Sequence, residues 1–123
     1  MLLTKFYDVL EVTRTDEQSL SAIVKLQAEH PIYEGHFPNF PVVPGVAMLQ
    51  ILTELTTSFV KQELILKTAS TIKFLNLVNP NDNATLHFEI KISEATEILK
   101  VKNVTSFPDG TLVMKCNVNF AKS

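Results

Sequence analysis

Alternation of apolar and polar residues predicts several β-strands along the chain. Over residues 20–28, 84–93 and 111–120, apolar residues occupy every second position and most residues between them are polar. A period of two is typical of a strand that buries one face. The less regular segments that we also expect to be strands are residues 6–13, 70–77 and 97–105. Turn-forming residues separate these elements at positions 15–17, 79–83 and 108–110.

A helix is predicted over residues 46–60, which contain neither Gly nor Pro. Pro44 and Gly45 precede it and Lys61 closes it, as expected for the two ends of a helix. Apolar residues cover most of its circumference, which indicates that protein encloses it. One narrow polar stripe remains, made of Gln50, Glu54, Thr57 and Lys61. Two strands, a loop, one helix and four further strands indicate an α+β fold.

Composition favours one globular domain over residues 1–123. Hydrophobic residues make up 46% of the 123 residues, and the net charge is −2, which disfavours a strongly basic nucleic-acid binder. A single cysteine, Cys116, excludes an intrachain disulfide framework and a CxxC metal site. With neither a signal peptide nor a long apolar run in the sequence, we expect a cytoplasmic protein that does not enter the membrane.

The candidate chemistry lies in the segment GHFPNFPVVPGV, residues 35–46. His36 follows a glycine, and prolines at every third position after it stiffen the chain, so that the imidazole is held in place for acid–base chemistry. The segment ends at the helix N-terminus at Pro44-Gly45, where the unpaired backbone N–H groups would stabilise a thioester or carboxylate oxygen. His30 and His87 have no such setting, and we expect them to be structural or solvated.

This motif resembles the signature of the 3-hydroxyacyl-acyl carrier protein dehydratases, a hot-dog-fold family of fatty-acid synthesis. Residues 8–12 and 73–82 also resemble the family's strands, and Asp109-Gly110 lies where the family makes its last hairpin. The resemblance implies a hot-dog fold, in which a curved antiparallel sheet of about five to six strands wraps around one long central helix. It also implies a homodimer with the active site in a tunnel between the protomers.

The resemblance further implies the roles of the site residues. His36 would take the proton next to the thioester, the Gly45 N–H would bind the thioester oxygen, and Val46 and Phe37 would line the substrate site. A helix carboxylate from the partner protomer would protonate the departing 3-hydroxyl group, leaving a trans-2-enoyl thioester. The substrate arrives on phosphopantetheine, from acyl carrier protein or coenzyme A, and no metal or redox cofactor is expected.

The sequence departs from the family at the acid. Gln50 occupies the position of the catalytic carboxylate, and an amide is not a carboxylic acid. Glu54 lies one helical turn later, on the same face. Glu54 is therefore either a displaced acid or a surface glutamate, and Gln50 could orient a substrate hydroxyl. The N-terminus also departs, so that Phe6 or Tyr7 would either line the tunnel or pack in the core.

Three functions remain open from the sequence. The first is dehydration of a (3R)-hydroxyacyl thioester, weak or altered because of Gln50. The second is non-catalytic binding of an acyl thioester or acyl carrier protein, as a partner subunit. The third is hydrolysis of acyl thioesters. An acidic carrier protein would need a basic docking patch, for which the candidates are Lys61, Lys67, Lys73, Lys91, Lys100 and Lys102.

Overall fold

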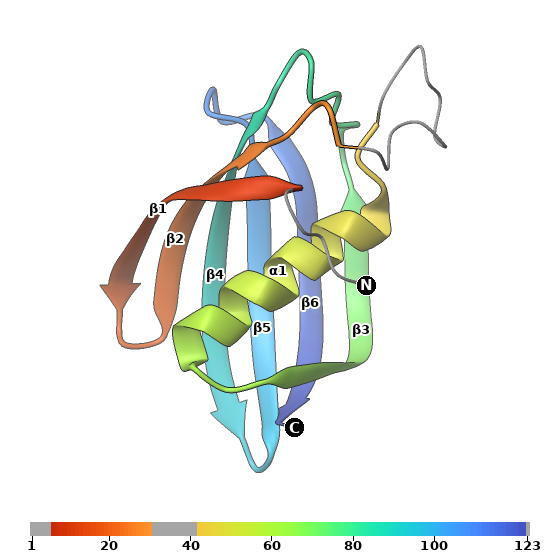
Figure 1. Cartoon of the computed structure of the whole chain (residues 1–123). Helices are drawn as coiled ribbons and strands as arrows, with labels where there is room; N and C mark the ends of the chain where they lie inside the picture. The colour runs from red at the N-terminus through yellow and green to blue at the C-terminus, as the bar shows by residue number, and fades with distance from the viewer. Residues whose placement is uncertain (1–5, 31–41, 123) are drawn as a thin grey trace.

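The computed structural model describes residues 6–30 and 42–122. Six antiparallel strands form one sheet in the order β1-β2-β4-β5-β6-β3, and one helix, α1, lies across it (Figure 1). The elements are β1 Tyr7–Asp16, β2 Ser19–Leu26, α1 Gly45–Val60, β3 Leu64–Phe74, β4 Thr85–Ala95, β5 Ile98–Ser106 and β6 Leu112–Lys122.

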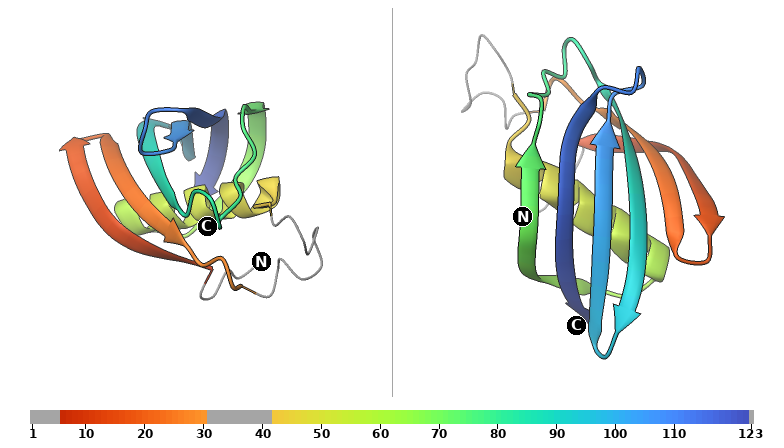
Figure 2. Two further views of the ribbon diagram at one scale, coloured as in Figure 1. Left: turned by 90° about the horizontal axis from the view of Figure 1, so that it is seen from above. Right: turned by 180° about the vertical axis from the view of Figure 1, so that it is seen from behind.

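The sheet curves, and α1 lies on its concave side (Figure 2). Strands β1 and β2 form one flank of the curve, and β3 forms the opposite edge. The apolar side chains of α1 that face the sheet are buried with those of the strands, and Ile51 and Leu52 are fully enclosed. The core therefore fills the space between one helix and one sheet, as the α+β interpretation predicted.

Local sequence explains where α1 begins and ends. Pro44 is the N-cap, with extended backbone, and Lys61 ends the helix in the left-handed region and donates its backbone N–H to the Thr57 carbonyl. The predicted helix is confirmed to within one residue. It has 16 residues, a length of about 24 Å at 1.5 Å per residue, so the expected long central helix is a helix of moderate length.

The regularly alternating strands are confirmed and the others are shifted. In β4, Leu86, Phe88 and Ile90 are buried, while Lys91 faces solvent. Strand β3 spans Leu64–Phe74, whereas the sequence predicts a strand over residues 70–77. The prediction is displaced because most side chains of this strand are exposed and no alternation marks its ends. The turn after β1 is also later than predicted, since β1 continues to Asp16.

A polar group lies within the core of the sheet. Asn103 is 2% exposed, and its Nδ2 donates to the Glu89 carbonyl at 3.0 Å. The buried Thr105 hydroxyl donates to Asn103 Oδ1 at 2.9 Å, and the Cys116 thiol approaches the same oxygen at 3.8 Å. Three neighbouring strands thus satisfy one buried amide.

Within the described residues, no helix has the length and apolarity that a membrane span requires.

Candidate active site

The helix N-terminus presents backbone amides that its own N-cap residue leaves without a side-chain acceptor. Pro44 makes no side-chain capping bond, and the first turn carries no acidic residue. The Ala47 and Met48 amides both donate to the Pro44 carbonyl, at 3.0 and 3.2 Å. Gly45 and Val46 come before them, as the first residues of the helix, so the helix itself provides no acceptor for their amides. This end of α1 therefore carries partial positive charge, as the sequence predicted. His36 and Phe37, the other predicted residues of this region, lie outside the described residues.

A pocket of about 310 Å³ opens beside this helix end, and it is mostly apolar. Its wall includes Val43, whose amide bonds to the Val78 carbonyl at 2.9 Å, and Phe74 from the end of β3. A Cβ atom added to Gly45 would lie 2.9 Å from Cζ of Phe74. Glycine at this position thus lets an aromatic ring lie directly against the helix end.

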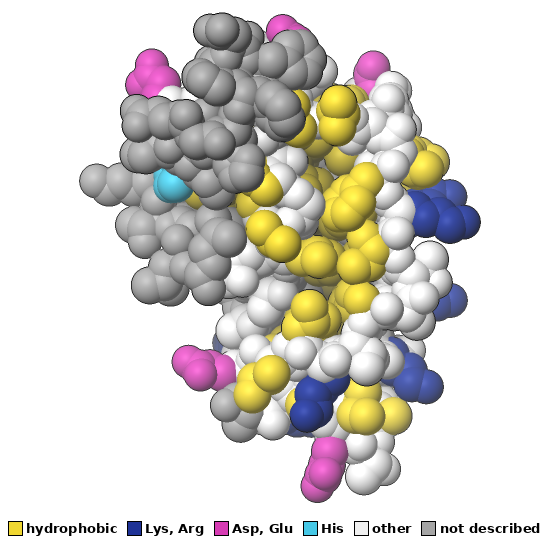
Figure 3. Space-filling view, turned by 90° about the vertical axis from the view of Figure 1, so that its right-hand side faces the viewer, with side chains coloured by type: hydrophobic (Ala, Val, Ile, Leu, Met, Phe, Trp, Pro, Cys, Tyr) yellow, Lys and Arg dark blue, Asp and Glu magenta, His cyan; other side chains and the backbone are white. Residues whose placement is uncertain are grey.

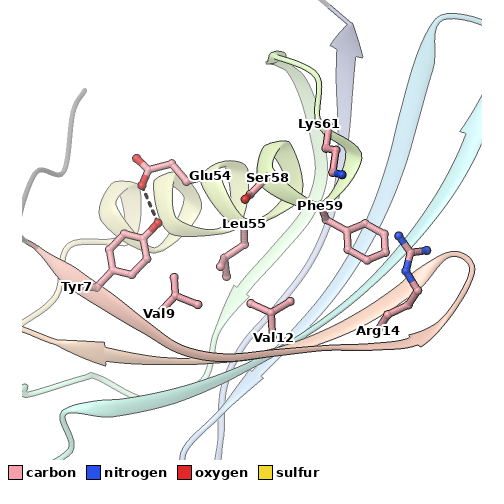
Figure 4. A pocket seen from close by; sticks show the side chains of 9 residues that line it. All are labelled: Tyr7, Val9, Val12, Arg14, Glu54, Leu55, Ser58, Phe59 and Lys61. Carbon is pink, nitrogen blue, oxygen red and sulfur yellow. Dashed lines mark hydrogen bonds between the residues drawn. The ribbon is translucent and has the colours of Figure 1, made fainter.

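Gln50 and Glu54 lie on one face of α1 and are hydrogen-bonded to each other. Gln50 Nε2 donates to Glu54 Oε2 at 2.9 Å, and the hydroxyl of Tyr7 donates to Glu54 Oε1 at 2.6 Å. Glu54 is therefore not a freely solvated surface glutamate, because each of its oxygens accepts a hydrogen bond from a half-buried partner. The carboxylate is held in one orientation by groups from two elements, α1 and β1. Figure 4 shows the bond from Tyr7 of β1.

Tyr7 keeps its proton in this arrangement. Burial raises the pKa of Tyr7 far above its ordinary value, and the hydrogen bond and negative charge of Glu54 raise it further. At neutral pH its hydroxyl is therefore a donor to Glu54 and not an anion. The sequence left open whether Phe6 or Tyr7 packs in the core. Phe6 is fully buried, with its ring edge-on to His30 at a centroid distance of 5.1 Å, whereas Tyr7 belongs to the site.

A groove of about 520 Å³ continues from Tyr7 and Glu54 between β1 and the second half of α1 (Figure 4). A register shift in β1 between Val9 and Glu11 shapes it. In a regular strand, Val9 and Val12 would point to opposite faces, but the bulge turns both toward α1. Arg14 and Lys61 lie at the far end of the groove.

Two other reactive side chains do not take part in this site. Cys116 is buried in the core, and its burial raises the pKa of the thiol to about 11, so it is not a nucleophile at neutral pH. His87 is hydrogen-bonded to Ser21 on the outer face of the sheet, which agrees with the structural role predicted for it. In the described parts of the chain, no three His, Cys, Asp or Glu side chains gather in a metal-binding arrangement.

Comparison with known proteins agrees with this architecture. A family model described as ApeI-like, ApeI dehydratase, matches residues 12–110. The chain is 30% identical to the 3-hydroxyacyl-[acyl-carrier-protein] dehydratase FabZ of Ruminiclostridium cellulolyticum, over 98% of this chain and 91% of that protein.

Solved structures share the fold at lower identity. The dehydratase heterocomplex ApeI:P from Xenorhabdus doucetiae has a TM-score of 0.77 at 16% identity, covering 93% of this chain and 96% of the other. A hypothetical thioesterase with coenzyme A from Streptococcus pneumoniae has a TM-score of 0.72 at 9% identity, covering 99% and 91%. These neighbours confirm the predicted hot-dog fold. Together with the family model and the FabZ relative, they show that this chain belongs to the ApeI-like family of dehydratases.

Proposed function

We propose that this protein dehydrates a (3R)-hydroxyacyl thioester, carried on phosphopantetheine, to the trans-2-enoyl thioester. The observation that carries the proposal is the pair of features on α1. The helix has an uncapped N-terminus at Gly45 and, further along, the carboxyl group of Glu54 held by Gln50 and Tyr7. The family membership supports the same reaction class.

In the proposed reaction, the backbone N–H of Gly45 binds the thioester oxygen and stabilises the charge that develops there. His36 takes the proton from C2, and the electron pair of that C–H bond forms the C2=C3 double bond. The C3–O bond breaks, and the departing hydroxyl group leaves as water with a proton from Glu54, which therefore has to enter the reaction protonated, with the proton on one of the two oxygens that accept hydrogen bonds in the free protein. The proton on His36 returns to the Glu54 carboxylate through solvent before the next turnover.

Gln50 and Tyr7 are positioning residues in this proposal. Each donates to one oxygen of Glu54, so that the carboxyl group points in one direction. Gln50 cannot replace the acid that the family carries at its position, because an amide does not release a proton at neutral pH. Glu54 compensates for the missing acid in this proposal, because its carboxyl group lies one helical turn after Gln50 and accepts a hydrogen bond from it.

One chain cannot supply both groups to the same substrate. Gly45 and Glu54 are nine residues apart, about 13.5 Å along the helix axis. The thioester oxygen and the 3-hydroxyl oxygen are separated by only three carbon atoms, about 5 Å with ordinary bond lengths. The Gly45 amide of one protomer would therefore work with Glu54 of a second protomer, in keeping with the tunnel between protomers that the resemblance implies.

The edge of β3 is the surface that we propose for this pairing. Strand β3 bonds to β6 on one side only, since it ends the sheet order. Figure 3 shows apolar side chains gathered on this side of the molecule. The exposed large apolar residues of β3 and the segment after it are Ile65, Leu66, Phe74, Leu75 and Leu77. An open strand edge flanked by apolar surface favours pairing with another strand, and we propose a homodimer.

Three of the lysines expected to dock a carrier protein, Lys73, Lys91 and Lys102, lie opposite another lysine in the sheet, and one of those partners is Lys115, which the sequence did not single out. Strand register places Lys91 directly opposite Lys102, and Lys73 directly opposite Lys115, all exposed on the outer face of the sheet. Like charges directly opposite destabilise a sheet, and the one ion pair found among the described residues, Lys122 with Glu94, involves none of these four. This surface supports the proposal of an acidic acyl carrier protein as the substrate donor.

The direct experiment mixes the purified protein with a 3-hydroxyacyl thioester on acyl carrier protein. We expect enoyl absorbance and exchange of the C2 proton, and both should disappear in His36→Ala. Unchanged turnover in His36→Ala would contradict the proposal. The Gln50→Glu variant tests the acid separately, because a large gain of activity would show that Glu54 does not serve.

Two alternatives give different results in the same experiment. Saturable binding of acyl carrier protein without turnover would indicate a non-catalytic partner subunit, a role that Gln50 favours because an amide stands at the position of the family's acid. Release of free thiol from acyl coenzyme A would indicate a thioesterase, the class for which the Streptococcus pneumoniae structural neighbour, a hypothetical thioesterase, is named.

A further inference from the structure

We infer that the groove between β1 and α1 binds the distal part of the substrate's acyl chain, and that Arg14 and Lys61 select a chain that ends in a carboxylate. The inference rests on the proposed function, because it assigns a substrate class to the same site. It starts from the position of the groove, which begins at Tyr7 and Glu54 and runs along the second half of α1 (Figure 4).

The walls of the groove suit a hydrocarbon chain. Val9 and Val12 of β1 face Leu55 and Phe59 of α1 across it. Although these valines point toward the helix, they are 48% and 52% exposed, because the groove separates the strand from the helix. A ligand's hydrocarbon chain that covers this apolar surface removes it from water, which favours binding.

The far end of the groove is cationic. The Arg14 guanidinium lies over the Phe59 ring, 4.3 Å from its centroid, and it donates a hydrogen bond to the Glu17 carbonyl at 3.1 Å. Lys61 lines the same end from the helix C-terminus. Neither side chain forms an ion pair with a carboxylate of the described residues. Guanidinium and ammonium groups at the end of an apolar groove are complementary to a carboxylate.

The distance along the groove indicates the length of the acyl chain that it would hold. Glu54 and Lys61 are seven residues apart, about 10.5 Å along the helix. An extended chain with carbon–carbon bonds of about 1.5 Å advances about 1.25 Å per bond, so that about eight bonds separate C3 from the terminal carboxylate. The preferred substrate is thus a medium-length 3-hydroxyacyl thioester with an acidic end.

The test measures binding apart from catalysis. Two saturated acyl-pantetheine thioesters of equal length, one ending in a methyl group and one in a carboxylate, are titrated into the protein by calorimetry. We expect the carboxylate-ended ligand to bind about tenfold more tightly, and Arg14→Gln with Lys61→Gln to abolish the difference. Lys25→Gln, which removes an exposed charge on β2 away from the groove, should keep it. Equal affinity of the two ligands for the wild-type protein, or a preference retained in the double variant, overturns the inference.

Turnover separates this inference from the proposed function. If the protein prefers the carboxylate-ended ligand but does not dehydrate the matching 3-hydroxyacyl thioester, the groove assignment stands and the proposed activity fails. If it dehydrates both thioesters with equal kcat/KM and binds both ligands equally, the activity stands and the groove assignment fails.

Discussion

The N-terminus of α1 and the region around Glu54, further along the same helix, differ in the groups that they offer a substrate. At the N-terminus, the chemistry belongs to the backbone, because the helix offers no acceptor to the Gly45 and Val46 amides and the N-cap residue Pro44 makes no side-chain capping bond. Further along, the chemistry belongs to side chains, because Glu54 accepts bonds from Gln50 and Tyr7. The backbone end would stabilise charge on the thioester, and the side-chain end would move a proton.

This difference means that the two ends tolerate substitution differently. A backbone amide survives most side-chain changes, so that the N-terminal end is sensitive mainly to what blocks access to it. A carboxyl group is lost with a single substitution. Substitutions along one helix can therefore separate binding from proton transfer.

The largest effect is expected for Glu54→Gln. The amide keeps the size of the side chain but cannot release a proton, and general acid catalysis contributes about 10²- to 10⁴-fold to a rate. We expect kcat to fall by at least about a hundredfold while KM changes little, measured by enoyl absorbance. Thr57→Ser, on the same polar stripe, is the control, and a Glu54→Gln enzyme with full kcat would remove Glu54 from the mechanism.

A smaller effect on the same end is expected for Tyr7→Phe. Loss of one hydrogen bond to Glu54 leaves the carboxyl group less well oriented, and we expect kcat to fall about tenfold, about 1.4 kcal/mol. An unchanged kcat would show that Gln50 alone positions Glu54.

The same variant changes the alkaline stability. Burial of Tyr7, with its bond to Glu54, raises its pKa, so the folded protein holds this proton more tightly than the unfolded chain. The resulting stability is complete below about pH 10, the ordinary tyrosine pKa, and is lost as pH rises above it. Urea unfolding of Tyr7→Phe between pH 9 and 11 should therefore show a weaker pH dependence than the wild-type protein.

At the other end, Gly45→Ala should affect binding and not proton transfer. The added methyl group would meet the Phe74 ring at 2.9 Å. Since Phe74 is 51% exposed, the ring can turn away and stability should change by less than about 1 kcal/mol. We expect kcat/KM to fall several-fold, because the thioester oxygen reaches the Gly45 amide less readily in both the bound substrate and the transition state. Combining Gly45→Ala with Phe74→Leu should recover part of the loss, and strictly additive effects would contradict this explanation.

The smallest effect is expected for Val46→Asp. This side chain is 62% exposed, so little buried apolar surface is lost, and a carboxylate in the first turn stabilises a helix by about 0.3–1 kcal/mol. We expect a slightly higher urea midpoint together with weaker thioester binding, because the new anion competes for the same amides. Higher stability with unchanged binding would argue against an oxyanion site at this helix end.

The sequence predicted the parts of the molecule that follow a local pattern. Strands with one buried face and the ends of α1 are marked by alternation, Pro44 and Lys61. The proximity of Gln50 and Glu54 also follows from helical spacing. Strand β3 could not be placed accurately, because its residues are exposed on both faces and carry no burial pattern.

The contact that holds Glu54 had no local signal. Tyr7 lies 47 residues from Glu54 in the sequence, and its contact depends on the path of β1 across the helix. The groove depends on a bulge at Val9–Glu11, which shifts the alternation of β1 and hides which residues share a face. Such features arise from tertiary packing and not from composition or period.

The buried amide of Asn103 has a consequence for how the sheet chooses its alignment. Strands β4, β5 and β6 all present apolar side chains to the core. Shifting β5 by two residues would therefore still place apolar side chains against the apolar core. This shift would move the Asn103 amide away from the Glu89 carbonyl. A buried polar group left without its hydrogen bond lowers the stability by about 1–3 kcal/mol. The buried amide of Asn103 therefore favours a single register among the strands β4, β5 and β6.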